Sequence, residues 1–387
     1  MTRPLILFGA FDRHNFGDLL FPHVCAALLP ARQPMVAALV ARDMRACGGY
    51  PTQAFPALAA RLQGQPADLL HAGGELLTCT AHEAAVMLLP EHDACAVLAA
   101  PGGPRLKPPG SDALLSYLAA PEMLPGARML YNAVGGVEFD YLDTQARAEA
   151  GHQLRSAHWL GVREHITQTA LARCGIQASL LPDSVSVVAE LFGARIAQHA
   201  ARGEPAAVTA IFPHGYLALQ FSADFGDDAT LDALAGQLER FAGQHRLGLV
   251  PFRAGAAPWH DALAPYERLA ARLRAPAHVF TSLDIWDICA LLAGSRGYCG
   301  TSLHGRIVAM AYGLPRLNFA RGAGGGKQRA YAAAWDADCP GVVDIDAIEP
   351  ALRVALALPR ARLQEHARRL AARYRIGFAA AAAMLAQ

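Results

Sequence analysis

Short apolar runs alternate with longer segments of helical periodicity through the first half of the chain. Each run ends in Gly, Asp, Ser or a charged residue, which is typical of buried parallel strands. The segments between them, such as 143–156 and 166–174, have the apolar spacing of amphipathic helices. The pattern predicts a mainly parallel sheet covered by helices on both faces. The expected strands are 5–11, 35–40, 68–71, 129–134, 159–162 and 179–181.

The alternation is interrupted by a polar stretch at about 193–205 and then restarts, which predicts a second domain of the same kind. The fold class expected is therefore α/β, with two Rossmann-like doubly wound domains at 1–195 and 205–345, and closing helices over 346–387. In the second domain, strands are expected at 208–212, 247–252, 278–281, 297–299, 316–319 and 342–345, and helices at 231–244, 262–273, 284–292 and 303–312.

Composition narrows the classes of protein. A chain of 387 residues is too long for one ordinary core. The formal net charge of +1, with 17% charged residues, gives no field that would attract nucleic acid. We expect a cytoplasmic protein without a signal peptide. The arginine spacing of the last helix favours a solvated face, and peripheral contact with the inner face of the cytoplasmic membrane stays an alternative.

Cysteine and histidine usage argues against cross-links and metals. The eight cysteines form no C-x-x-C pair, which favours reduced, buried thiols. The fifteen histidines include no H-E-x-x-H motif and no clustering with cysteine. We therefore expect no metal ion and no redox cofactor.

The stretch 299–315 carries the most distinctive chemistry. It is predicted to be the end of a strand, a tight turn containing Gly300, and a helix. Ser302 is a suitable N-cap, and the N–H groups of the first turn form an anion site. His304 and Arg306 belong to this turn and suit a phosphorylated or carboxylated substrate. The alternative is that His304 only caps or packs the turn.

Three familiar motifs are not matched. Gly9 and Gly17 are too far apart for a dinucleotide-binding loop. The segment 322–327 lacks the residues of a Walker A loop, so we interpret it as a mobile basic loop with Lys327, or as a flexible turn. In 300–304 the last glycine of a nucleophile elbow is replaced by His304.

Polar residues follow several other predicted strands, where ligands of such sheets bind, and we expect them to face a cleft between the domains. Asp18 can accept a proton from a sugar hydroxyl or cap a helix. Arg163 can clamp an anion, or pair with Glu164 or Asp183. Asp183 can orient Arg163 or His304, or cap the helix after it.

Together these pieces resemble the polysaccharide pyruvyl transferase family, in its order over residues 5 to about 330. The resemblance implies the two-domain GT-B architecture. The matching segments are Asn15-Phe-Gly-Asp18, His71-Ala-Gly-Gly-Glu-Leu-Leu77, Gly161-Val-Arg-Glu164, Pro182-Asp-Ser184, Gly300-Thr-Ser-Leu-His-Gly-Arg-Ile-Val-Ala309 and Gly313-Leu-Pro315.

The resemblance also implies an activity: transfer of the pyruvyl group of phosphoenolpyruvate to a sugar of a cell-surface polysaccharide or its lipid-linked precursor, with loss of phosphate. Phosphoenolpyruvate is a co-substrate, and no cofactor is implied. His304 and Asp18 would be catalytic. The donor side would comprise Arg163, Ser302, Leu303, His304, Arg306 and Lys327; the acceptor side would comprise Asn15, Asp18, Gly73 and Gly74, with Asp183 in support.

One position departs from the family. Many relatives have arginine two residues before the histidine, where this chain has Ser302. Arg306 can supply the charge from the same turn, or the donor is held by Arg163, Arg321 or Lys327. Two other classes stay open. A GT-B glycosyltransferase would need a slot for a nucleotide, for which Tyr298 and Asp284 are the candidates, and a non-catalytic scaffold on the same fold would need neither.

Overall fold

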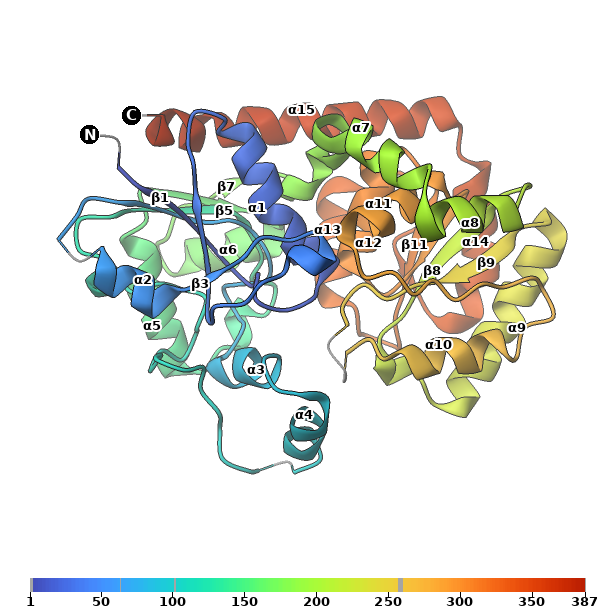
Figure 1. Ribbon diagram of the computed structural model, residues 1–387, viewed down its shortest axis with the longest axis horizontal. Coiled ribbons are helices and arrows are strands. Elements are labelled where there is room, and N and C mark those ends of the chain that lie inside the picture. The colour runs from blue at the N-terminus through green and yellow to red at the C-terminus, as the bar shows by residue number, and fades with distance from the viewer. Residues whose placement is uncertain (1–2, 63, 101, 257–259, 387) are drawn as a thin grey trace. The chain divides into compact units, whose positions relative to one another are not determined.

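The computed structural model describes residues 3–62, 64–100, 102–256 and 260–386, shown in Figure 1. They form two compact units, Met1–Ser184 with Ala372–Gln387 (unit 1) and Val185–Ala371 (unit 2). The units divide after Ser184, whereas the sequence suggested a boundary between 195 and 205. The last helix, α15 (Arg360–Leu385), contributes residues to both units and is not a separate closing layer.

Unit 1 contains a sheet in which all paired strands are parallel. The strand order is β3-β2-β1-β4-β5-β6-β7, so successive strands are added on one side of β1 up to β3 and on the other side from β4 onward. The strands are β1 (Leu5–Phe8), β2 (Met35–Ala38), β3 (Gln53–Ala54), β4 (Asp68–His71), β5 (Arg128–Val134), β6 (Trp159–Val162) and β7 (Ser179–Leu180); the α-helices are α1 (Phe16–Leu28), α2 (Phe55–Arg61), α3 (Ala81–Val86), α4 (Glu91–Leu98), α5 (Thr144–Arg155) and α6 (His165–Arg173).

The core of unit 1 lies between the sheet and helices α2, α5 and α6, which contribute residues such as Leu58, Leu154 and Leu171. The end of α15 also packs on this unit. Its Phe378 ring meets Trp159 edge-on, with ring centroids 6.2 Å apart. Further along β5, the buried Asn132 amide donates to the Tyr374 hydroxyl at 2.9 Å and accepts from it at 3.1 Å. This reciprocal pair satisfies polar groups that would otherwise be costly to bury.

Unit 2 contains a second parallel sheet, of order β12-β11-β10-β8-β9. One face packs against α9 and α14, and the other against α11 and α12. The strands are β8 (Tyr216–Gln220), β9 (Gly248–Pro251), β10 (Gly297–Gly300), β11 (Arg316–Phe319) and β12 (Val342–Val343); the remaining α-helices are α7 (Val188–Ala200), α8 (Gly203–Ile211), α9 (Asp228–His245), α10 (Leu263–Ala270), α11 (Ile285–Gly294), α12 (Leu303–Ala311), α13 (Gly326–Trp335) and α14 (Ile348–Ala357).

The expected strand at 278–281 is reduced to two parallel bridges, Ala277 to Leu249 and Phe280 to Phe252. If this segment is counted as a strand, it lies next to β9 at the edge of the sheet. The strand order is then that of a Rossmann fold, in which the order of the strands reverses between β8 and β10. Both sheets therefore open a ligand-binding edge at the carboxyl end of a reversal point.

One expected strand was wrong. Residues 208–212 belong to α8 and the turn after it, and the first strand of unit 2 is β8, four residues further on. The β-branched residues of 208–212 suggested a strand. However, α8 begins at Gly203 with Pro205 in its first turn, where proline is tolerated. Tyr216–Gln220 is buried throughout and fills the central position instead.

The α/β fold with two Rossmann-like sheets is confirmed. Within the described ranges, every helix is too short or too polar to cross a lipid bilayer.

The Asn132–Tyr374 pair predicts a stability effect. Tyr374→Phe removes the hydroxyl and leaves the buried amide short of a partner, so the free energy of unfolding should fall by about 1–3 kcal/mol. Tyr141→Phe is the matched control, because Tyr141 is 86% exposed. Urea denaturation followed by circular dichroism measures both, and equal midpoints would contradict the role given to the pair.

Candidate functional site

The turn between β10 and α12 is a rigid, capped helix start. Ser302 is the N-cap, and its hydroxyl accepts a hydrogen bond from the backbone N–H of Gly305 at 3.2 Å. Leu303, His304 and Gly305 follow as the first helical residues; the Gly305 N–H is used by the cap, and the N–H groups of Leu303 and His304 have no acceptor within the helix. The predicted capped helix start therefore lies at the reversal point of the unit 2 sheet, and anion binding there stays a prediction.

Neighbouring strands fix the backbone of this turn. The amide N–H of Ser302 donates to the Gln220 side chain at 2.7 Å and to the Tyr298 hydroxyl at 3.0 Å. The Asn318 amide donates to the Gly300 carbonyl at 2.6 Å. A Cβ atom on Gly305 would lie 2.4 Å from the Tyr298 ring. The motif glycines here are thus required for packing against Tyr298, which was not expected from the sequence.

His304 lies in this first turn with 8% of its surface exposed, and Leu303 before it is buried. The imidazole is therefore held at the start of a helix whose dipole favours negative charge beside it. This position is compatible with a proton donor to a bound anion.

Arg306 has a different environment from the one expected. It is fully buried, and its Nε and Nη2 atoms contact the Asp336 carboxylate at 2.8 and 2.7 Å. Its other N–H groups donate to Asn318 and to the carbonyls of Pro340 and Gly341, at 3.3, 2.9 and 3.3 Å. These contacts are four hydrogen bonds and an ion pair, so the guanidinium is used inside the protein. Arg306 anchors α12 and is not available to hold a donor phosphate.

The loop 321–327 carries two more cations at the carboxyl end of β11. The Arg321 guanidinium pairs with Asp227 and stacks over Phe225, 5.0 Å from the ring centroid. Lys327 is exposed in the first turn of α13. The next residue, Gln328, donates to the Thr301 carbonyl, so α13 is tied to the capped turn.

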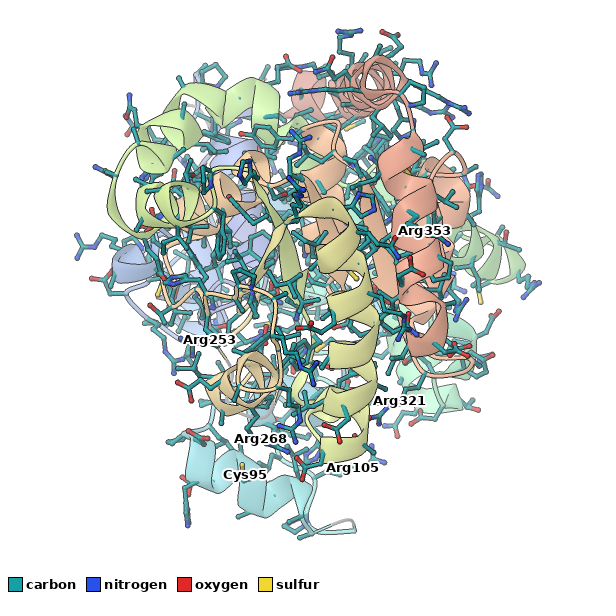
Figure 2. All side chains as sticks on the ribbon, turned by 90° about the vertical axis from the view of Figure 1, so that its right-hand side faces the viewer. Cys95, Arg105, Arg253, Arg268, Arg321 and Arg353 are labelled. Atoms are coloured by element: carbon teal, nitrogen blue, oxygen red, sulfur yellow. The ribbon has the colours of Figure 1, made fainter. Side chains whose placement is uncertain are left out.

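The sequence analysis missed Arg253, which follows β9 at the same edge of the sheet (Figure 2). Within the described part of the chain, Arg253 makes no hydrogen bond or ion pair, although its Nε atom is buried. The only available signal was its place after a predicted strand, the same signal that singled out Arg163. With no protein partner among the described residues, the half-buried Arg253 guanidinium is a candidate for holding an anion at this end of the sheet.

Asp261 connects the Arg253 loop to the capped turn. Its carboxylate accepts from the backbone N–H groups of Ala254 and Gly255 at 2.6 and 3.1 Å. It also accepts from the Gln220 side chain at 3.2 Å, and Gln220 in turn holds Ser302. Burial raises the pKa of Asp261 to about 7, although these hydrogen bonds oppose the shift.

In unit 1, the predicted acceptor residues gather at the reversal point between β1 and β4. Asn15 is the N-cap of α1 and accepts from the N–H groups of Gly17 and Asp18 at 3.2 and 3.4 Å. Asp18 does not cap this helix. Its carboxylate lies 3.9 Å from Arg13, and a Cβ on Gly74 would lie 3.5 Å from its Oδ1 atom. Asn15, Asp18 and Gly74 are thus brought close together.

Gly73 and Gly74 both have backbone conformations that favour glycine, with φ angles of 133° and 100°. A Cβ on Gly73 would lie 2.6 Å from the Phe21 ring of α1. These glycines let the end of β4 pass directly beside the start of α1.

Arg163 is surrounded by carboxylates. Its guanidinium contacts Glu75 at 2.8 Å, Glu164 at 2.6 Å and Asp183 at 3.0 Å, and the residue is 1% exposed. Arg163 therefore forms the ion pairs with Glu164 and Asp183 that the sequence analysis gave as its alternative role. The Asp183 carboxylate contacts Arg163 and can orient it. A Cβ on Gly135 would lie 2.4 Å from Glu75, so the glycine makes room for this cluster.

Burial raises the pKa of Glu164 to about 7 and outweighs the nearby Arg163 charge. Glu75, which is one-quarter exposed, is the cluster's outward-facing carboxylate, and it also accepts from the Val137 N–H at 2.9 Å. The family segment containing Glu75 thus contributes a carboxylate that the sequence analysis did not single out.

One group of possible metal ligands occurs among the described residues: His199, Asp284 and Asp287. Their polar atoms already have protein partners. The His199 ring contacts Asp287 at 2.6 Å through Nδ1 and Arg202 at 2.9 Å through Nε2, and Asp284 caps α11. The group therefore joins α7 to α11, and the expectation of no metal cofactor stays a prediction.

Solved structures define the class of fold. A UDP-GlcNAc 2-epimerase from Neisseria meningitidis bound to UDP-GlcNAc is similar over 100% of both chains, with 10% identity and a TM-score of 0.58. A UDP-N-acetylglucosamine 2-epimerase from Rickettsia bellii covers 100% of this chain and 98% of its own, with 8% identity and a TM-score of 0.58. A trehalose 6-phosphate synthase from Burkholderia multivorans is similar over 97% of this chain and 95% of its own, with 11% identity and a TM-score of 0.53. The chain has the GT-B fold of these proteins.

The family follows from the sequence model of polysaccharide pyruvyl transferases, which matches residues 15–322. The chain belongs to the polysaccharide pyruvyl transferase family and is a transferase. No curated protein matches it significantly.

The position of Arg306 predicts a structural phenotype. Arg306→Gln leaves Asp336 buried with Arg316 as its remaining close partner, so the free energy of unfolding should fall by about 3 kcal/mol. The exposed Arg353→Gln is the control. Urea denaturation measures both, and a stable Arg306→Gln protein with weakened donor binding would contradict the anchoring role.

The same cluster predicts a pH dependence. Burial raises the pKa of Asp336, but Arg306 and Arg316 outweigh it and hold the pKa below its ordinary value. A depressed pKa in the folded state stabilises the fold above the unfolded-state pKa, so this contribution should disappear as the pH falls below about 4. Thermal melts from pH 7 to pH 3 should show a smaller destabilisation by Arg306→Gln at the acid end. An unchanged difference would contradict this assignment.

Proposed function

We propose that this transferase moves the pyruvyl group of phosphoenolpyruvate onto a sugar of a cell-surface polysaccharide or its lipid-linked precursor. The observation that carries the proposal is His304, held in the first turn of a capped helix at the reversal point of the unit 2 sheet. Family membership supports the reaction class. No cofactor beyond the co-substrate is part of the proposal, and contact with the inner membrane face stays a prediction.

The donor carries a carboxylate and a phosphate, so its site needs more than one cation or helix end. Arg306 and Arg163 are occupied by carboxylates of the protein. We assign the donor charges to Arg253, Lys327 and the N–H groups of the α12 start. This set supplies the positive charge that relatives place at the position of Ser302.

The chemistry balances with the residues available. A proton from the His304 imidazole adds to the methylene carbon of the donor, and a sugar hydroxyl attacks the adjacent carbon. A second hydroxyl of the same sugar then displaces phosphate and its proton leaves with the phosphate, giving a cyclic ketal and inorganic phosphate. Asp18 accepts a hydroxyl proton on the acceptor side, with Asn15 holding the start of its helix.

A nucleotide-sugar glycosyltransferase is the other class on this fold, and the similar epimerase from Neisseria was solved with UDP-GlcNAc. The two side chains that were candidates for binding a nucleotide form hydrogen bonds within the protein instead. Tyr298 is fully buried and bonded to Ser302, and Asp284 accepts from the Trp286 N–H at 2.8 Å. Neither side chain can stack on a base or hold a ribose without breaking these contacts.

Calorimetric titration separates the two classes. Phosphoenolpyruvate should bind the purified protein, and UDP- and GDP-sugars should not. His304→Gln should retain donor binding within about threefold but lose at least about 100-fold in turnover, because general acid catalysis contributes about 10²–10⁴-fold. Phosphate release detected by ³¹P NMR measures turnover with a sugar acceptor. Binding of nucleotide sugars alone would exclude the proposal.

Arg253→Gln tests the donor assignment. Losing one charge-assisted hydrogen bond should weaken phosphoenolpyruvate binding by about tenfold or more. Arg268→Gln is the control, because Arg268 pairs with Asp228 on the surface of unit 2. An unchanged dissociation constant for Arg253→Gln, with the wild-type protein binding normally, would remove Arg253 from the site and leave the reaction class intact.

A further inference from the structure

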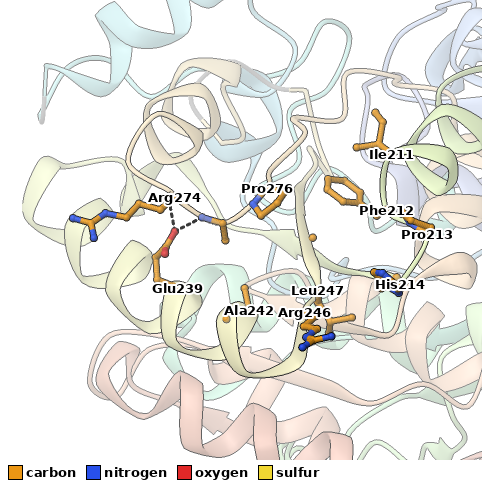
Figure 3. A pocket seen from close by; sticks show the side chains of 14 residues that line it. Ile211, Phe212, Pro213, His214, Glu239, Ala242, Arg246, Leu247, Arg274 and Pro276 are labelled. Carbon is orange, nitrogen blue, oxygen red and sulfur yellow. Dashed lines mark hydrogen bonds between the residues drawn. The ribbon is translucent and has the colours of Figure 1, made fainter.

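Unit 2 has a pocket of about 420 Å³ at the amino ends of its strands, whereas His304 lies beyond their carboxyl ends (Figure 3). It is lined by the residues just before β8 and β9 and by Arg274, Ala275 and Pro276 before the bridge at Ala277. These are the amino ends of parallel strands, whereas His304 follows the carboxyl end of β10. The pocket is therefore distinct from the donor site, and its volume lies within the range for small-molecule sites.

The floor of the pocket is apolar and tightly built. The ring of Phe212 rests against Gly248, where a Cβ would lie 2.2 Å from the ring. Ala242, Leu247 and Pro276 complete the apolar lining. Ile211 in the lining is 51% exposed. The interior thus suits the apolar part of a ligand.

The charged groups of the lining favour an anion. His214, Arg246 and Arg274 all line the pocket. The one acidic residue of the lining, Glu239, accepts from the N–H groups of Arg274 and Ala275, so its charge is already balanced by backbone donors. In Figure 3, Arg246 and His214 lie toward one side of the pocket with Phe212, and the Arg274 side chain extends to the other side.

Arg246 has an unusual backbone for its residue type. It ends α9 in the left-handed conformation with φ of 55°, where glycine is the common residue. An arginine at this position is unfavourable for the fold by itself. Its presence at the mouth of an apolar pocket therefore indicates a use for the guanidinium.

We propose that this pocket binds a small amphiphilic anion, a molecule with an apolar body of a few rings or branches and one carboxylate, phosphate or sulfonate group. The apolar body fits against Phe212, and the anionic group pairs with Arg246 and His214. The proposal does not depend on the pyruvyl transfer assigned to the other edge of the sheet.

The first test uses 8-anilinonaphthalene-1-sulfonate as an anionic probe and N-phenyl-1-naphthylamine as a neutral probe of the same shape. A Cβ on Gly243 in the lining would meet no atom within 4 Å. Gly243→Phe should therefore fill the pocket and weaken binding of the anionic probe at least tenfold. Gly243→Ala, which adds a side chain of little volume at the same position, should bind it normally. Binding that survives in a folded Gly243→Phe protein would overturn the site.

The second test separates binding from a structural role. Arg246→Gly should keep or raise the melting temperature, because glycine suits the left-handed conformation. The same substitution should weaken binding of the anionic probe about tenfold. It should leave the neutral probe unaffected. Equal weakening of both probes, or none, would overturn the assignment of Arg246 to the anion. Adherence of the protein to anionic phospholipid vesicles, with no saturable binding of the soluble probe, would instead identify a membrane contact and overturn the small-molecule proposal.

Discussion

The Asp336 carboxylate, buried between Arg306 and Arg316, is the interaction on which the geometry of unit 2 depends. It joins α12, β11 and the end of α13 through charges that have little access to water. The α12 start then has one position relative to the sheet, and Tyr298 and Gln220 fix its backbone from the other side. A helix start held this firmly can orient a bound anion without rearranging, which is the condition for electrostatic catalysis.

The two units use arginine in the same way. In each, a family-motif guanidinium is buried against carboxylates of its own unit: Arg163 contacts three of them, and Arg306 contacts Asp336. Such clusters are expensive to desolvate and fix the positions of several strand ends at once. The cost is compatible with the proposed donor site, in which the less buried groups Arg253 and Lys327 can exchange water for ligand.

Much of the fold and of the capped turn could be predicted from sequence, because alternating apolar runs and a glycine-containing strand end are local signals. The error at 208–212 arose because β-branched residues in a short run do not distinguish a strand from a helix that tertiary packing selects. The role of Arg306 could not be predicted, since its carboxylate partner is 30 residues away. Arg253 lacked any motif, and only its position beside Asp261 and β9 distinguishes it from other surface arginines.

The long helix α15 has a consequence for how the chain folds. Unit 2 is a single stretch of sequence, but unit 1 needs residues from both ends of the chain, including Tyr374 for the buried Asn132. During synthesis from the N-terminus, every strand of the unit 1 sheet leaves the ribosome before unit 2, but the α15 segment that packs on β5 and β6 leaves after it. The surface that this segment covers must remain soluble while all of unit 2 is made, so the first domain to appear is the second to be completed.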